Sequence, residues 1–349
     1  MLSNLQFESF AALLNGAATI HGLDAVPAWQ NPSQGFKVLH PTLRSMGGHN
    51  LGLLLKIGLG EELEAGEKKQ LLFNSLTRQQ VAQKIQVQFF DQSIRFAFVK
   101  GIAQDAKYWS NLPARMYSDI DIWVHPHDFN AAQQTVMSLG YEKIRPVQKL
   151  PLTHLQVPAL FSQQANPKVC SIDMHPVPFD GFRRPKEWDN IWGRTETVET
   201  SVGVRTVLPP EDEILFWAGN QLKSLFGQWP KACLDTFVMI QRENIDWHYL
   251  QQAARNANLA WPLWALLSML NSFHIDIPQK ILEDLAPPQF IATHLYGCMS
   301  SQKKAGPSRL DSGLRVLQVL GLSQDWFGSL HYGLNWLPKR MVEQLWLSR

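Results

Sequence analysis

Two aspartates two residues apart, Asp119 and Asp121, are the side chains of this sequence whose type and spacing point most clearly to chemistry. They lie in the segment 117–124, whose alternating apolar positions predict a β-strand. Because side chains alternate across a strand, both carboxylates share one face, while Ile120 and Ile122 take the other. Adjacent carboxylates repel each other unless a cation offsets their charge. Oxygen ligands at this spacing suit Mg²⁺, which proteins bind through one or two carboxylates plus substrate phosphates.

A third carboxylate, Asp173, comes from a later predicted strand at 168–174. It shares its strand face with His175, which we expect to help bind the substrate. If the two strands are neighbours, three carboxylates converge on one metal site. The alternatives are a strand end with two solvated aspartates, Asp119 and Asp121, and a strand edge at Asp173 with a hydrogen-bonded histidine.

A zinc site is a competing interpretation of the same part of the chain. His125, His127, Asp128 and His175 are of the types that bind zinc, but their spacing matches no established zinc pattern. The three cysteines are odd in number and form no C-x-x-C pair, so neither a disulfide framework nor a zinc site is indicated. Reduced thiols, and with them a cytoplasmic location, are expected.

Phosphate-binding residues are predicted after a short strand at 94–99. Lys100 and Gly101 stand between this strand and a predicted helix at 102–109, where backbone N–H groups favour an anion. Glycine lets a phosphate approach the backbone, and lysine adds a point charge. Arg115, just before the aspartate strand, could contact a phosphate or pair with an aspartate. The alternative for Lys100 is a solvated lysine before a turn.

Asp235 lies among apolar residues of a predicted helix at 231–241. A buried carboxylate needs a partner, and Lys223 on the preceding predicted helix at 214–226 is the candidate. A structural ion pair is favoured, although both side chains could face the cleft.

Composition narrows the class of protein. The chain has 349 residues, of which 45% are hydrophobic, so it can form a sizeable core in two or three domains, or in one domain with a helical extension. A formal net charge of +2 argues against a long nucleic acid as partner, whereas a nucleotide needs only a few placed charges. The N-terminus has no signal-peptide pattern, and the most apolar stretch, 259–270, is too short to span a bilayer, so no membrane is expected.

Hydrophobic periodicity divides the chain into three regions, which predict an α+β fold with a small mixed sheet flanked by helices. Residues 1–90 are expected to be helical, with a proline-rich loop at 26–41. Residues 91–208 are expected to form the α/β core, with Asp128 capping a helix at 129–139 and strand-like alternation at 195–207. Residues 209–349 are expected to be helical again.

Taken in order, these motifs resemble the uncharacterised nucleotidyltransferase family of the DNA polymerase beta-like superfamily. The resemblance covers about residues 60–260. The motifs that carry it are Phe98-Val99-Lys100-Gly101, Arg115 with Asp119-Ile120-Asp121, Leu139-Gly140-Tyr141, Asp173-Met174-His175, Leu208-Pro209-Pro210-Glu211-Asp212 and Leu234-Asp235.

The resemblance implies transfer of a nucleoside monophosphate from a nucleoside triphosphate to a hydroxyl-bearing acceptor, with release of pyrophosphate. The acceptor could be a small molecule, a peptide or a protein. The implied catalytic and metal-binding residues for Mg²⁺ or Mn²⁺ are Asp119, Asp121 and Asp173, and those that bind the nucleotide are Lys100, Gly101, Arg115 and His175. One alternative is a non-catalytic member of the fold that binds a peptide or protein partner. Another is a kinase-type phosphotransferase, which would release ADP.

Overall fold

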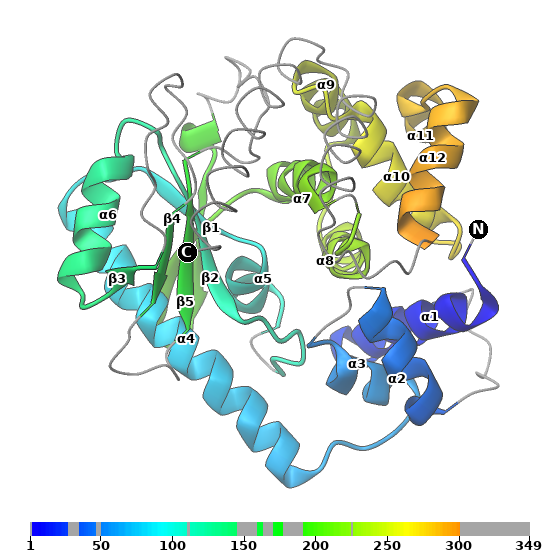
Figure 1. Ribbon diagram of the computed structural model, residues 1–349, viewed down its shortest axis with the longest axis horizontal. Coiled ribbons are helices and arrows are strands. Elements are labelled where there is room, and N and C mark those ends of the chain that lie inside the picture. Colours follow the sequence, from blue (N-terminus) through cyan, green and yellow to red (C-terminus); the bar gives the residue numbers. More distant parts are fainter. Residues whose placement is uncertain are drawn as a thin grey trace, which may run out of the picture.

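A seven-stranded mixed sheet forms the centre of the computed structural model, with strand order β3-β4-β5-β2-β1-β7-β6 (Figure 1). The pairs β1–β7 and β2–β5 are parallel, and the remaining pairs are antiparallel. The expected mixed sheet, and with it the α+β class, is confirmed. The strands are β1 (Phe96–Val99), β2 (Asp119–Val124), β3 (Glu142–Lys143), β4 (Ala159–Ser162), β5 (Ser171–His175), β6 (Glu196–Thr200) and β7 (Gly203–Val207).

The structure describes residues 2–26, 35–46, 50–109, 112–144, 159–162, 170–176, 191–224 and 226–300, without the side chains of 222–224. Several predictions therefore lie outside the described residues: most of a strand expected at 155–161, a short helix at 187–190 and helices beyond 300. Within the described part of the chain, no helix is both long and apolar enough to cross a membrane.

The aspartate strand β2 has the two-faced character that its sequence predicts. Ile120 and Ile122 are fully buried in one hydrophobic cluster, to which helices α4 (Ala65–Asp91) and α6 (Phe129–Ser138) contribute. Trp123, on the opposite face, belongs to the second cluster. Because both faces are covered, β2 is a central strand and its aspartates cannot all be solvated.

The remaining helices pack mainly around the second cluster (Figure 1). Phe7 of α1 stacks on Phe273 at 4.4 Å between ring centroids, and Phe10 meets Trp229 edge-on at 4.7 Å. The N-terminal helix α1 thus packs against helices from the C-terminal part of the chain, whereas α4 packs on the sheet. The predicted domain boundaries at residues 90 and 208 stay a prediction. These helices are α1 (Asn4–His21), α2 (Phe36–Ser45), α3 (Gly52–Gly58), α5 (Gly101–Lys107), α7 (Pro210–Ser224), α8 (Trp229–Arg242), α9 (Trp247–Asn256), α10 (Ala260–Asn271), α11 (Gln279–Leu285) and α12 (Gln289–Ser300).

Helix α2 occupies part of the segment predicted as a proline-rich loop, so that prediction is wrong for residues 36–41. Pro41 lies inside the helix and leaves one backbone hydrogen bond unmade. Leu39 and Leu43, one turn apart, are fully buried in the second cluster, and this packing outweighs the local cost of the proline.

The strand-like alternation expected at 195–207 is confirmed, since the segment forms a hairpin of β6 and β7 in which Gly203 has a φ of 118°. One further local prediction is corrected. Asp128 stands at the N-terminus of α6 but makes no capping hydrogen bond. Its carboxylate instead accepts hydrogen bonds from the Arg95 guanidinium at 2.7 and 3.1 Å and from the Arg95 backbone N–H at 3.1 Å.

Candidate active site

Strands β2 and β5 run parallel as neighbours and bring the expected acidic residues together. Asp121 lies opposite Asp173 in the register, and Trp123 lies opposite His175. Ligand atoms of Asp121, Asp173 and His175 lie within 4.8 Å of one another. The two strands are therefore neighbours, as a shared site requires. We call Asp121, Asp173 and His175 the acidic cluster.

His175 ties the two carboxylates of the acidic cluster together. Its Nε2 lies 3.1 Å from Oδ1 of Asp121 and 3.3 Å from Oδ2 of Asp173. Burial by itself would lower the pKa of His175, but the two aspartates outweigh burial and raise it. The two carboxylates therefore favour the protonated, positively charged form of the imidazole between them.

Lys100 supplies a second positive charge. It follows β1, whose antiparallel pairing places Val99 opposite Asp121. The Lys100 ammonium lies 2.6 Å from Oδ1 of Asp121. Burial would raise the pKa of Asp121, but Lys100 and His175 reverse this and hold it below its usual value. In this structure Lys100 is thus a half-buried counter-ion of Asp121, not the solvated lysine of the alternative interpretation.

The backbone of Lys100 is held in an uncommon conformation, with φ of 57° and ψ of −133°. Its N–H donates to Oε1 of Glu213 in α7 at 2.6 Å. Such a backbone conformation costs a non-glycine residue about 1–3 kcal/mol and persists only where the surroundings enforce it. Glu213 therefore fixes the path of the chain from which the Lys100 side chain reaches Asp121.

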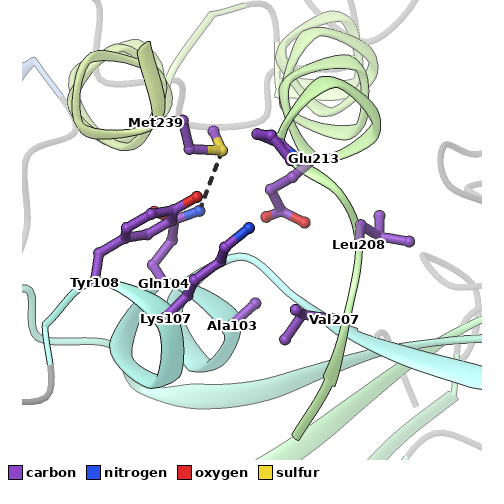
Figure 2. A pocket seen from close by; sticks show the side chains of 9 residues that line it. Ala103, Gln104, Lys107, Tyr108, Val207, Leu208, Glu213 and Met239 are labelled. Atoms are coloured by element: carbon purple, nitrogen blue, oxygen red, sulfur yellow. Dashed lines mark hydrogen bonds between the residues drawn. The ribbon is translucent and has the colours of Figure 1, made fainter. Parts of the chain in front are cut away.

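Glu213 was not predicted as a site residue, because its acidic run after Pro209-Pro210 is also what a helix N-terminus favours. Burial raises the pKa of its carboxyl to about 8. The carboxyl faces a small pocket between α5, α7 and α8, beside Gln104 and Lys107 (Figure 2). The free volume of about 10 Å³ is at most what one water needs, so this pocket is not a substrate site.

Asp119 lies on the same strand as Asp121 but outside the acidic cluster. It is half-buried and accepts a hydrogen bond from Oγ of Ser118 at 3.1 Å. Burial and the nearby charge of Asp121 raise the pKa of Asp119. Its expected role as a metal ligand stays a prediction.

Arg115 is paired within the protein. Its guanidinium makes two hydrogen bonds with the Asp235 carboxylate, at 2.8 and 2.9 Å, and a third with the Met116 carbonyl. Of the two outcomes considered for Arg115, the structure shows pairing with an aspartate. It also identifies the partner of Asp235 as Arg115, whereas the side chain of Lys223 lies outside the described residues.

Gly101 is needed for packing. A Cβ built on it would lie 2.4 Å from the Cβ of Tyr117, closer than real Cβ contacts come. The glycine lets the start of α5 lie directly against the segment that leads into β2, and a phosphate contact at its amide stays a prediction.

The donor set of the acidic cluster fits a divalent cation, because carboxylates are the preferred ligands of Mg²⁺ and Mn²⁺. Among the described residues it is the single group of three acidic, histidine or cysteine side chains close enough to share an ion. The alternative zinc set does not converge: Asp128 binds Arg95, and Nδ1 of His125 accepts the His127 N–H.

The fold and the acidic cluster define the class of a nucleotidyltransferase, and comparison with known families agrees. Residues 44–274 match the family described as uncharacterised nucleotidyltransferase, and the chain belongs to that family. No curated protein matches the chain. Among solved structures, the antibiotic-resistance factor ANT(2'')-Ia matches with 12% identity and a TM-score of 0.31, over 58% of this chain and 94% of its own.

Proposed function

We propose that the protein transfers a nucleoside monophosphate from a nucleoside triphosphate to a hydroxyl-bearing acceptor, with release of pyrophosphate. The observation that carries the proposal is the acidic cluster: Asp121 and Asp173 face each other on adjacent parallel strands, with compensating positive charge in contact. A buried carboxylate, Asp121, and a half-buried one, Asp173, are costly to hold this close together unless cations offset their charge.

Asp121 and Asp173, together with Asp119, would hold Mg²⁺ or Mn²⁺. Such an ion supplies Lewis-acid stabilisation of phosphoryl charge and favours the deprotonated form of an acceptor hydroxyl. The chain itself orients the ligands, because His175 bonds both carboxylates. Lys100, now on Asp121, would offset phosphate charge that arrives beside this carboxylate.

A candidate site for the acceptor lies at α2 and α3, and no residue of the acidic cluster lines it. A hollow of about 540 Å³, within the size range of ligand sites, is lined by Phe36, His40 and Lys56 of α2 and α3 and by Met116. Met116 lies three residues before Asp119, so one wall of the hollow continues into the aspartate strand. Its lining combines the Phe36 ring with a Lys56–Glu67 ion pair, which favours a small polar acceptor.

Two rival functions are distinguished by their products. A non-catalytic binding protein has no need for Asp173 to share a site with Asp121, so their contact through His175 favours catalysis. A kinase would use the same cations but transfer the γ-phosphate.

The test incubates the protein with Mg²⁺, pooled small-molecule and protein acceptors, and nucleoside triphosphates labelled at either the α- or the γ-phosphate. Nucleotidyl transfer places the α-label on an acceptor and the γ-label in pyrophosphate. Asp173→Asn should abolish both, whereas Asp128→Asn, an aspartate paired with Arg95 outside the cluster, should not. A γ-labelled acceptor with ADP as product would establish a kinase instead.

A further inference from the structure

Three cations surround the acidic residues, and two of them are already paired. Lys100 contacts Asp121, and Arg115 is bound by Asp235. The third is Lys231, in the first turn of α8, which is half-buried. Within the described part of the chain, its ammonium makes no hydrogen bond or ion pair.

The position of Lys231 follows from the contacts of α8. Lys231 and Asp235 are four residues apart on the helix, so they lie on one face, with Cβ atoms about 5–6 Å apart. Asp235 holds Arg115, and this ion pair fixes that face of α8 against the segment that enters β2. Lys231 is therefore directed toward the start of β2.

The charges around Lys231 agree with this placement. Burial and the neighbouring guanidinium of Arg115 lower the pKa of Lys231 to about 8, against the opposing influence of Asp119, Asp235 and Asp121. Negative charge from these three carboxylates therefore acts on the Lys231 ammonium.

Asp119 and Lys231 carry opposite charges but make no ion pair with each other. Both residues are half-buried, and the Asp119 carboxylate favours the charged form of Lys231. Opposite charges in a partly desolvated site attract more strongly than in water. A ligand that carries both signs, such as a metal-bound phosphate, satisfies both groups at once: its cation meets the carboxylate, and its phosphate oxygens meet the ammonium.

We propose that Lys231 binds the phosphate chain of the nucleotide at the candidate active site, on the α8 side, opposite the strand that carries Asp119. This assignment rests on the proposed function. It gives the three cations different tasks: Arg115 positions α8, Lys100 balances the charge of Asp121, and Lys231 binds phosphate.

The test measures binding of inorganic tripolyphosphate with Mg²⁺ by calorimetry, because this probe has no base and requires no acceptor. Lys231→Met keeps most of the side chain and removes the charge, and it should weaken binding about 10- to 100-fold, the range of a charge-assisted hydrogen bond. Lys231→Arg should stay within a few-fold of wild type, which a merely structural role would not require.

A matched control is available at Lys143 on the edge strand β3. It is also half-buried with its pKa lowered by burial, but it bonds Gln133 and lies at the far edge of the sheet from β1. Lys143→Met should bind tripolyphosphate like wild type. Equal affinity of Lys231→Met and wild type overturns the assignment to Lys231 and leaves the proposed function standing. Absence of binding to wild type overturns both.

A second measurement needs no variant. Around pH 8, a lysine with a lowered pKa is more reactive toward acetic anhydride than ordinary lysines. Peptide mapping by mass spectrometry should show Lys231 acetylated in the free protein and protected by Mg²⁺-tripolyphosphate, while Lys143 is not protected. Equal acetylation of Lys231 with and without the probe contradicts the assignment.

Discussion

Replacing Arg115 by methionine tests whether this arginine holds the fold together or binds phosphate. Its side chain is 3% exposed, and that of its partner Asp235 is 0% exposed. Arg115→Met leaves the Asp235 carboxylate buried without its cation. Removing one partner of a buried pair costs about 3–5 kcal/mol, because the remaining charge is left uncompensated. We expect Arg115→Met to lose about that much free energy of unfolding.

The assay is urea unfolding at neutral pH, followed by tryptophan fluorescence, with a double variant as the internal control. Arg115→Met with Asp235→Leu removes both charges, so most of the lost stability should return. The coupling between the two substitutions should be on the order of 2–3 kcal/mol. A single variant with near wild-type stability, but much weaker tripolyphosphate binding, would refute the structural role and make Arg115 a phosphate ligand.

Two further predictions concern Glu213 and Gly101. Burial raises the pKa of Glu213 from 4.5 to about 8, so the folded chain keeps a proton that the unfolded chain has lost. Its contribution to the free energy of unfolding therefore falls as the pH rises between these values. Glu213→Gln should lessen this slope by at most about 1.4 kcal/mol per pH unit, measured by urea unfolding at several pH values; identical slopes would contradict the buried acid. Gly101→Ala brings a methyl group against Tyr117 and should destabilise by about 1–3 kcal/mol in thermal unfolding, while Gly66→Ala, in open space on α4, should be neutral or stabilising. Equal melting temperatures for the two would refute the packing role.

The elements that the sequence predicts well are those with a strong period. The aspartate strand alternates strictly, so its location and its two faces follow from sequence, as does the shared face of Asp173 and His175. From the sequence, the carboxylates converge only if their two strands are neighbours, and hydrophobic periodicity does not tell which strands pair. The pairing of β2 with β5 decides that point.

Contacts between residues far apart in the chain could not be predicted from the sequence. Arg115 and Asp235 are 120 positions apart, and Lys223 on the neighbouring helix looked the better partner for Asp235. The bond from the Lys100 N–H to Glu213 likewise spans 113 positions. Both contacts depend on how α7 and α8 pack against the sheet. Local propensity also failed for α2, where buried leucines outweigh an interior proline.

The central claim is that the carboxylates of the acidic cluster hold a divalent metal for nucleotidyl transfer. The most direct measurement is a Mn²⁺ titration followed by electron paramagnetic resonance, in the presence of tripolyphosphate, on wild type, Asp173→Asn and Asp128→Asn. Asp173 is the suitable target because its side chain is 26% exposed, so the isosteric change disturbs packing little. We expect bound Mn²⁺ in wild type and Asp128→Asn, and affinity at least about tenfold weaker in Asp173→Asn. Equal Mn²⁺ affinity in all three proteins would contradict the claim.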